Sequence, residues 1–221
     1  MLAAPDKLIQ TVSETIVALL RPGAGLFILD PAAAVARELA MRDDCTIAVV
    51  HPCRPSFFLD QDTFEARHDR FGGAGGKQDL VMAKIQDDDQ VFAQCQAVCR
   101  AMFAPVAHVY TMGIRDIAFL EPMLVERLGA TCLFTMAETV NQAISRGIDK
   151  QAAISFMTGH IYNLTANFLG LLGDTPVSNA SKVAIGLGNK QVLREDWKRI
   201  RDDAVLDRVV AQMLHPDQPH I

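Results

Sequence analysis

The front half of the chain alternates short apolar runs with helical and loop segments. GLFILD at 25–30 and CTIAVV at 45–50 predict two short buried strands. Residues 77–86 and 106–112 predict two more strands after intervening polar segments. A helix over 11–20 precedes the first strand. Apolar strands separated by helices or loops are typical of an α/β fold with a parallel sheet.

The second half of the chain has the spacing of long helices. One apolar helix is predicted over 113–146, ending at Gly147, and a second over 149–172. Helices that are apolar on several faces pack in a bundle or against another subunit. We therefore predict an α/β domain over residues 1–111 and a helical domain over 112–221.

Charge and composition exclude several classes of partner. The net charge is −5 with acidic and basic residues mixed, so the chain has neither a nucleic-acid footprint nor a polybasic membrane patch. The first residues lack a secretory signal pattern, and no apolar run reaches the roughly 18 residues of a membrane span. The five cysteines lack the CxxC spacing of a zinc or redox motif. We expect a cytoplasmic protein with no nucleic-acid or membrane partner.

Five ordered blocks carry a family resemblance. They are HPCRPSFF at 51–58, FGGAGGKQ at 71–78, RAMFAPV at 100–106, FLEPMLVERLGATC at 119–132 and EDWKRI at 195–200. Together they resemble the phosphogluconate dehydrogenase-like and β-hydroxyacid dehydrogenase superfamily, and within it the D-apionate oxidoisomerase branch. The resemblance implies a partial Rossmann-like sheet followed by a helical domain for substrate binding and dimerisation.

The resemblance also implies an oxidoreductase of carbohydrate acid metabolism. Such enzymes oxidise a hydroxyl of a sugar acid with NAD or NADP, and the oxidoisomerase branch couples the oxidation to a carbon-skeleton shift. A homodimer acting on a small sugar acid is therefore expected. A divalent metal that binds both oxygens during the shift is a further option.

The chain departs from this family at its front. Family members open with a strand, a GxGxxG turn and a helix, whereas the early glycines here are Gly23 and Gly25. Such glycines let the backbone approach a pyrophosphate. The sequence therefore predicts a family member that lacks the dinucleotide-binding loop, as a fragment of a longer enzyme or as a cofactor-free descendant.

Two segments beside predicted strands hold candidate substrate-binding residues. His51 follows the strand at 45–50, and side chains beyond the carboxyl ends of parallel strands line the ligand crevice. Gly72 and Gly73 resemble a loop that closes over substrate in relatives, and Lys77 after them could hold a carboxylate. The alternatives are a histidine that caps a loop and a solvated turn.

Glu121 lies on an apolar stripe of the first long helix. Its neighbours at helical spacing are Ile114, Ile117, Ala118, Leu124, Val125 and Leu128. A buried carboxylate needs a partner, so a general acid or base, a metal ligand and a buried salt bridge are competing interpretations. Relatives with a catalytic lysine place it near this point, so the glutamate argues against lysine-based oxidative decarboxylation.

A polar lane follows the second long helix. Asn163 and Asn167 come three and seven residues after His160, in a segment otherwise rich in apolar residues. Such a lane either faces a site or packs through hydrogen bonds inside the helix bundle.

We predict that these residues converge on one cleft between the α/β and helical portions. The catalytic candidates are Glu121, His160 and Lys77. The substrate-binding candidates are His51, Gly72, Gly73, Asn163 and Asn167. The metal-ligand candidates are His51, Glu121 and His160. Two other functions stay open: a non-catalytic helical dimerisation protein, and a metal-dependent isomerase that uses no nucleotide.

Overall fold

A computed structural model describes residues 1–85, 89–171, 173 and 176–218. Gln86 and Leu172, at which two predicted elements end, lie outside the described residues. Within the described residues, every helix is too short or too polar to span a bilayer.

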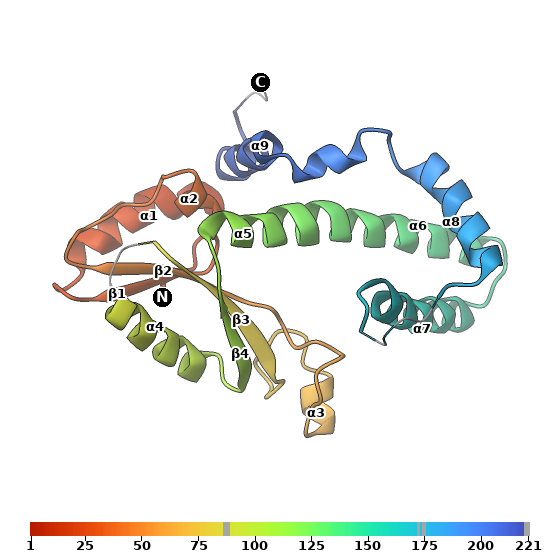
Figure 1. Cartoon of the computed structure of the whole chain (residues 1–221), viewed down its shortest axis with the longest axis horizontal. Coiled ribbons are helices and arrows are strands. Elements are labelled where there is room, and N and C mark those ends of the chain that lie inside the picture. Colours follow the sequence, from red (N-terminus) through yellow and green to blue (C-terminus); the bar gives the residue numbers. More distant parts are fainter. Residues whose placement is uncertain (86–88, 172, 174–175, 219–221) are drawn as a thin grey trace. The chain divides into compact units, whose positions relative to one another are not determined.

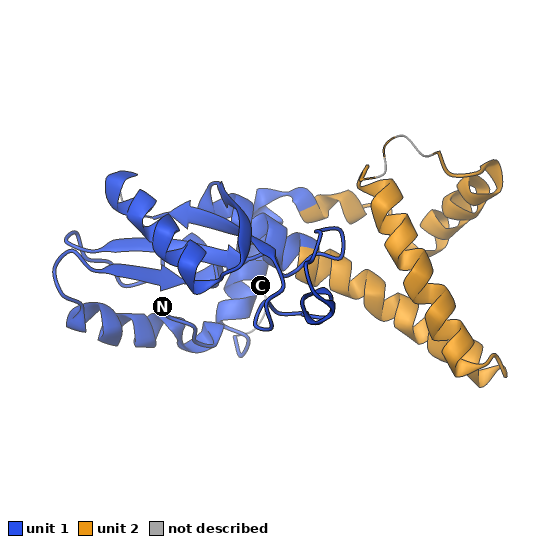
Figure 2. Ribbon diagram, turned by 90° about the horizontal axis from the view of Figure 1, so that it is seen from below, with its two compact units in different colours: residues 1–124, 201–221 blue, residues 125–200 orange. Residues whose placement is uncertain are grey.

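The chain divides into two compact units (Figure 2). Unit 1 comprises residues 1–124 and 201–221, and unit 2 comprises residues 125–200. The last helix of the chain packs into unit 1. The division into an α/β domain over residues 1–111 and a helical domain over 112–221 stays a prediction.

The described residues of unit 1 form a four-stranded sheet in the order β1-β2-β3-β4. Its strands, all close to their predicted positions, are β1 (Gly25–Ile28), β2 (Thr46–Pro52), β3 (Gln78–Lys84) and β4 (Val106–Thr111). β1 pairs with β2, and β3 with β4, in parallel. The sheet followed by helices confirms the predicted class, an α/β portion plus an all-α portion.

The expectation of a fully parallel sheet is wrong at one pair, because β2 and β3 are antiparallel. A parallel connection needs a crossover, usually through a helix that runs the length of the sheet. The connection over residues 53–77 carries only the four-residue helix α3 (Phe64–Arg67). The chain therefore reverses direction at the end of β2, and β3 begins at that same end of the sheet and runs antiparallel to β2. We call residues 53–77 the β2–β3 loop.

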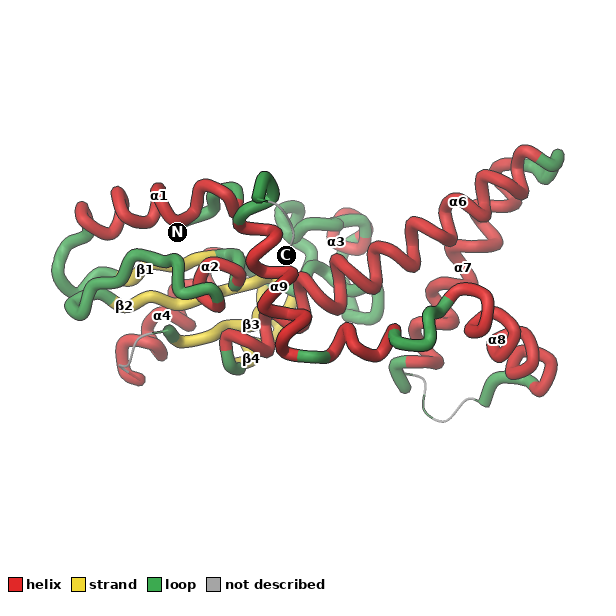
Figure 3. The backbone as a smooth tube through the Cα atoms, turned by 90° about the horizontal axis from the view of Figure 1, so that it is seen from above, coloured by secondary structure: helices red, strands yellow, loops and turns green. Residues whose placement is uncertain are grey.

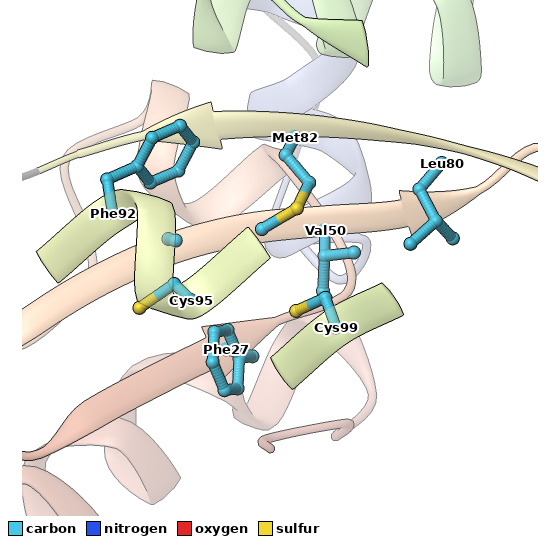
Figure 4. Packing of buried hydrophobic residues seen from close by; sticks show 8 residues of the cluster. Phe27, Val50, Leu80, Met82, Phe92, Cys95 and Cys99 are labelled. Carbon is cyan, nitrogen blue, oxygen red and sulfur yellow. The ribbon is translucent and has the colours of Figure 1, made fainter. Parts of the chain in front are cut away.

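Helix α4 (Asp89–Met102) covers one face of the sheet (Figure 4). Its buried side chains pack on apolar residues of β1, β2 and β3, namely Phe27, Val50, Leu80 and Met82 beneath Phe92, Cys95 and Cys99. Each large apolar side chain buried in this way contributes about 1.5–3 kcal/mol. Burial raises the pKa of the Cys99 thiol to about 12, so this cysteine is a packing residue.

The opposite face of the sheet is covered by helices from the beginning, the middle and the end of the chain (Figures 1 and 3). They are α1 (Asp6–Leu19), α2 (Ala32–Val35), α5 (Ile114–Ala118) and α9 (Asp203–Leu214). α9 packs against α1 and α2, and α5 packs against α2 and β3. His215 Nε2 lies 2.9 Å from Glu38 Oε1, which fixes the end of α9 to the segment after α2.

The first long helix is not uniformly α-helical, in contrast to the prediction over 113–146. A π-helical segment, η1 (Phe119–Ala130), separates α5 from α6 (Thr131–Ser145). Pro122 lies inside η1, and a proline removes one N–H donor and collides with the carbonyl four residues earlier. The wider π turn relieves that collision, and π segments are frequent at functional sites.

Unit 2 contains α6, α7 (Lys150–Phe168) and α8 (Asn179–Val192), followed by the 3-10 helix η2 (Trp197–Arg201). Gly147, at φ +95, ends the first of these helices as predicted. Asp149 caps α7 by accepting the Ala152 N–H at 2.9 Å.

Unit 2 buries very little of its apolar surface within the described chain. Ala166 is its only buried residue among those described. Large apolar side chains that stay more than half exposed include Phe134, Phe156, Phe168, Leu169, Val183 and Val192. An apolar groove of about 740 Å³ within this unit is lined by residues that include Met136, Val140, Phe156, Met157, Val192 and Leu193.

Candidate active site

His51 lies near the carboxyl end of β2. Alternation along the strand turns Ala48 and Val50 toward α4, so His51 points to the opposite face. There its Nδ1 lies 3.1 Å from the Leu29 carbonyl oxygen and 3.2 Å from Glu121 Oε2. The His51 and Glu121 side chains are only 23% and 17% exposed. The structure therefore brings these two candidates together.

The surroundings of His51 favour the neutral imidazole. Burial lowers its pKa and is the largest influence; the hydrogen bond with Leu29 raises it, the Arg54 charge lowers it, and Asp30 raises it. Both neighbours of Nδ1 are acceptors, so in the neutral ring the proton resides on Nδ1. Nε2 is then an acceptor, and no described residue is seen to bond to it.

Asp30 is a third titratable group in this region, and the sequence analysis missed it. Asp30 lies two residues beyond the end of β1, as His51 lies one residue before the end of β2, and it accepts the Ala32 N–H at 2.6 Å. Burial raises the pKa of Asp30, while that hydrogen bond and the His51 charge lower it. The signal was available, because a carboxylate directly after an apolar strand satisfies the same rule that selected His51.

Glu121 is positioned by the apolar start of η1. Ile117, Ala118, Pro122 and Met123 around it are buried, whereas Leu124 is 43% exposed. The predicted apolar stripe is thus confirmed on its N-terminal side only. The carboxylate reaches His51 from this packed segment, which limits the freedom of the pair.

The glycine-rich segment is wrapped around its own carboxylate, that of Asp69. Asp69 Oδ1 accepts the N–H groups of Phe71, Gly72 and Gly73 at 3.1, 2.8 and 3.3 Å. Asp69 Oδ2 accepts those of Ala74 and Gly76 at 2.7 and 2.9 Å. These bonds, that of Gly76 first, hold the pKa of Asp69 well below its usual range. In this conformation the N–H groups of Gly72 and Gly73 are occupied, so their contact with substrate stays a prediction.

Lys77 binds other residues of the β2–β3 loop with both its side chain and its backbone. Its Nζ donates to the Asp60 carbonyl at 3.3 Å and lies 3.8 Å from Asp62 Oδ1. Its backbone N–H donates to the side chain of buried Gln61 at 2.7 Å. A catalytic role for Lys77 stays a prediction.

The polar lane of α7 lies in unit 2 and makes contacts within its own helix. Asn167 Nδ2 donates to Asn163 Oδ1 at 2.8 Å. His160 Nδ1 lies 2.7 Å from the Phe156 carbonyl oxygen, and its ring stacks on that of Phe156 with centroids 4.1 Å apart. These contacts fit the packed alternative, and a substrate-facing role for the lane stays a prediction.

The structure brings one pair of these residues into contact, and the shared cleft stays a prediction. His51 and Glu121 both belong to unit 1, whereas His160 belongs to unit 2. Among the described residues, no group of three or more His, Cys, Asp or Glu side chains is arranged to hold a metal ion. A metal site formed by these three residues stays a prediction.

The chain is similar in sequence to a known family and to enzymes of known activity. Residues 59–214 match the model of the phosphogluconate dehydrogenase (decarboxylating) C-terminal family. The chain is 66% identical over 220 residues to a D-apionate oxidoisomerase from Blautia hydrogenotrophica, covering 99% of this chain and 77% of that protein. It is 36% identical to a D-apionate oxidoisomerase from Pectobacterium atrosepticum, covering 98% and 76% of the two chains.

A solved structure resembles the whole described architecture. It is that of a semialdehyde dehydrogenase NAD-binding protein from Cupriavidus necator in complex with calcium and NAD. The TM-score is 0.89 at 34% identity, and the match covers 96% of this chain and 76% of that one. The Rossmann-like expectation for the sheet is thereby confirmed.

Proposed function

The chain belongs to the phosphogluconate dehydrogenase (decarboxylating) C-terminal family, and from that membership we propose that it is an NAD-dependent oxidoisomerase of a sugar acid, with D-apionate as its substrate. The 66% identity to a D-apionate oxidoisomerase over nearly the whole chain supports the reaction type and the substrate. The single observation that carries the site is the contact between His51 and Glu121 at the end of β2.

His51 is the proposed general base. A neutral imidazole that donates its Nδ1 proton to the Leu29 carbonyl, with Glu121 Oε2 3.2 Å from Nδ1, presents a lone pair on Nε2. Oxidation of a hydroxyl to a ketone requires a base for the hydroxyl proton, within hydrogen-bond reach. The Leu29 carbonyl fixes the ring orientation, and the Glu121 carboxylate stabilises the imidazolium that forms. This modifies the expectation from sequence, which placed His51 among the substrate-binding and metal-ligand candidates and not among the catalytic ones.

The same pair serves the carbon-skeleton shift. Once the hydroxyl carbon beside the carboxylate is a ketone, a hydroxyl on the next carbon loses its proton and becomes a carbonyl. A carbon substituent migrates with its bonding electrons to the ketone carbon, whose oxygen takes up a proton and becomes a hydroxyl. Atoms balance, and one group that accepts and returns a proton suffices. His51 is suited to that exchange because burial holds its pKa below the usual value.

Within the described residues, the glycine-rich segment does not form a dinucleotide phosphate cradle. No GxGxxG pattern occurs in the sequence, and the N–H groups of the glycine-rich segment are bonded to Asp69. A nicotinamide cofactor, when bound, supplies the hydride acceptor.

The exposed apolar side chains of unit 2 support a further proposal, that the protein is a homodimer. Its helices leave large apolar side chains exposed over the described residues, and exposed apolar patches of this kind mark interfaces. A second copy of the chain provides a surface of the same composition, as in the self-complementary contacts of twofold dimers.

The test of the proposed function is an assay of both half reactions. The chain is incubated with D-apionate and NAD, and reduced nicotinamide is followed by absorbance. Separately, the 2-keto form of the substrate is supplied and its isomerisation is followed by carbon NMR, which needs no nicotinamide. We expect His51→Gln to lower both rates by about 10²–10⁴-fold.

Cys99→Ala is a control outside the site, because Cys99 lies on the α4 face of the sheet. It should leave the rates per folded molecule unchanged. Wild-type protein that converts neither D-apionate nor its 2-keto form would refute the proposed function. Full activity in His51→Gln would refute the assigned base.

A further inference from the structure

Arg54 opens the β2–β3 loop three residues after His51. Its Nη1 donates to the Phe71 carbonyl at 3.4 Å, and its guanidinium lies 5.2 Å from the centroid of the Phe71 ring. Its side chain is exposed, and no carboxylate of the described residues pairs with it. The guanidinium is therefore held in place against the loop with donors to spare.

Arg42 provides a comparison, because all of its guanidinium nitrogens are hydrogen-bonded to other residues of the protein. Its Nε and Nη2 bind both oxygens of Asp44, at 2.7 and 2.8 Å. Its Nη1 donates to the carbonyls of Val17 and Leu20. In Arg54 the corresponding pair of donors faces no carboxylate of the described chain, although a guanidinium fork matches a carboxylate in geometry and charge.

The backbone at Arg54 is unfavourable for its residue type. Its φ is +65, in the left-handed region where glycine and asparagine are at home. A left-handed backbone points the side chain in a different direction from that of a residue in an extended strand. Residues with such strained backbones cluster at ligand sites. The conformation sets the Arg54 side chain against Phe71.

Arg54 is also electrostatically linked to the base. Its charge is one of the influences that lower the pKa of His51, so the two groups lie within Coulombic range. A sugar acid oxidised beside its carboxylate must place that carboxylate close to the hydroxyl that loses a proton. A cation near the base, and not already paired, is what such a substrate requires.

We infer that Arg54 binds the carboxylate of the sugar acid whose hydroxyl proton His51 accepts. The inference rests on the proposed function and adds a substrate-binding residue that determines specificity for acids over neutral polyols. Arg54 orients the substrate by a bidentate contact, while the Phe71 carbonyl and ring keep its guanidinium in position.

The test uses Arg54→Asn, because asparagine tolerates a φ of +65 and removes the positive charge. The KM for D-apionate should rise about 10- to 100-fold, with a much smaller change in kcat, as expected for loss of a charged hydrogen-bonded contact. The amide of D-apionate, which lacks the negative charge, should have the same KM in wild type and variant. Arg54→Lys should retain part of the affinity for the acid.

Arg70→Asn is the matched control. Arg70 is an exposed arginine of the same loop, and it lines a cavity of about 600 Å³ whose lining does not include Arg54 or His51. Its replacement should leave the KM for the acid unchanged. A loss of affinity in Arg70→Asn with none in Arg54→Asn would overturn the inference, as would an unchanged KM in Arg54→Asn while the wild type is active.

Calorimetry separates this inference from the proposed function. If the wild type shows no turnover, the proposed function fails, and D-apionate binding to wild type and variant decides the role of Arg54. Binding that disappears in Arg54→Asn supports the inference, whereas equal or absent binding overturns it. Should Arg54→Asn not fold, Arg54→Gly, which favours the same backbone conformation, takes its place.

Discussion

The two compact units of this protein differ in how they use apolar residues. In unit 1 a sheet is packed on both faces, and strand residues such as Ile47, Val49 and Leu80 are fully buried. In unit 2 the helices are equally apolar, yet Ala166 is the only buried residue among those described. Unit 1 therefore has its own core, whereas the stability of unit 2 depends on whatever covers its apolar side chains.

A local motif found in both units makes the same point. Phe64 contacts His68 with tilted rings, and Phe156 stacks on His160, each pair four residues apart with centroids at 4.1 Å. The two phenylalanines are 71% and 69% exposed. The first lies on a four-residue helix of a polar loop, and the second borders the apolar groove of unit 2. The surroundings distinguish them, although the motif is the same.

The largest expected effect follows from the same substitution in the two units. Leu80→Ala empties a site that is 0% exposed and should lower the free energy of unfolding by about 2–5 kcal/mol. Leu187→Ala acts on a side chain that is 59% exposed and should change it by about 0.5 kcal/mol or less in dilute protein. Urea denaturation measures both. Equal losses in the two variants would remove the contrast between the units.

A smaller effect is expected on self-association. Phe156→Asp places a charge at the apolar groove and should weaken the homodimer by about 10- to 100-fold in dissociation constant. Phe64→Asp, its counterpart in unit 1, should not. Light scattering over a dilution series measures the dissociation. A wild type that is monomeric at every concentration would contradict the proposed dimer.

Two glycines of the β2–β3 loop provide a more local test. Gly72 has φ +84, and a Cβ there would overlap the amide of buried Gln78. Gly75 has φ +91, but a Cβ there meets nothing within 4 Å. Gly75→Ala should cost about 1–2 kcal/mol from backbone conformation alone, and Gly72→Ala should cost more because the amide must also move. Equal losses on thermal unfolding would show that Gln78 can give way.

The smallest expected effect is on the pH dependence of stability, through the Asp69 carboxylate that binds the N–H groups of this loop. The pKa of Asp69 lies below its unfolded value of roughly 3.9, so its contribution to stability is present above about pH 4 and is lost as the pH falls toward the folded pKa. Asp69→Asn should therefore be less stable than wild type at pH 6, and the difference should shrink below about pH 3. A difference that does not vary with pH would mean that the Asp69 charge contributes nothing.

Much of the fold follows from local patterns in the sequence. The four strands were predictable because apolar runs of four to seven residues between turn residues leave few alternatives. The reversal between β2 and β3 was not, because strand direction depends on where a loop returns, and the Asp69 contacts that close it join residues by geometry rather than by pattern. The π segment at Pro122 was missed because periodicity assumes a constant turn.

The candidate site was only partly predictable. The strand-end rule selected His51, and the apolar stripe selected Glu121, but neither signal indicates that the two touch. Asp30 satisfied the same rule and was overlooked. Arg54 could not be found in this way, because its left-handed backbone and its contact with Phe71 have no sequence signature.

The central claim is that Nε2 of His51 acts as the base and that the Glu121 carboxylate, 3.2 Å from Nδ1, stabilises the imidazolium that forms. It is tested most directly by the pH dependence of kcat/KM for isomerisation of the 2-keto acid, in wild type and Glu121→Gln. Because burial lowers the pKa of His51, the wild-type kcat/KM should fall only below about pH 6.5. Glu121→Gln should be slower by about 10²-fold or more, and its acid limb should move to lower pH because a negative charge beside the imidazole has been removed. A variant with the wild-type rate and an unmoved acid limb would contradict the account.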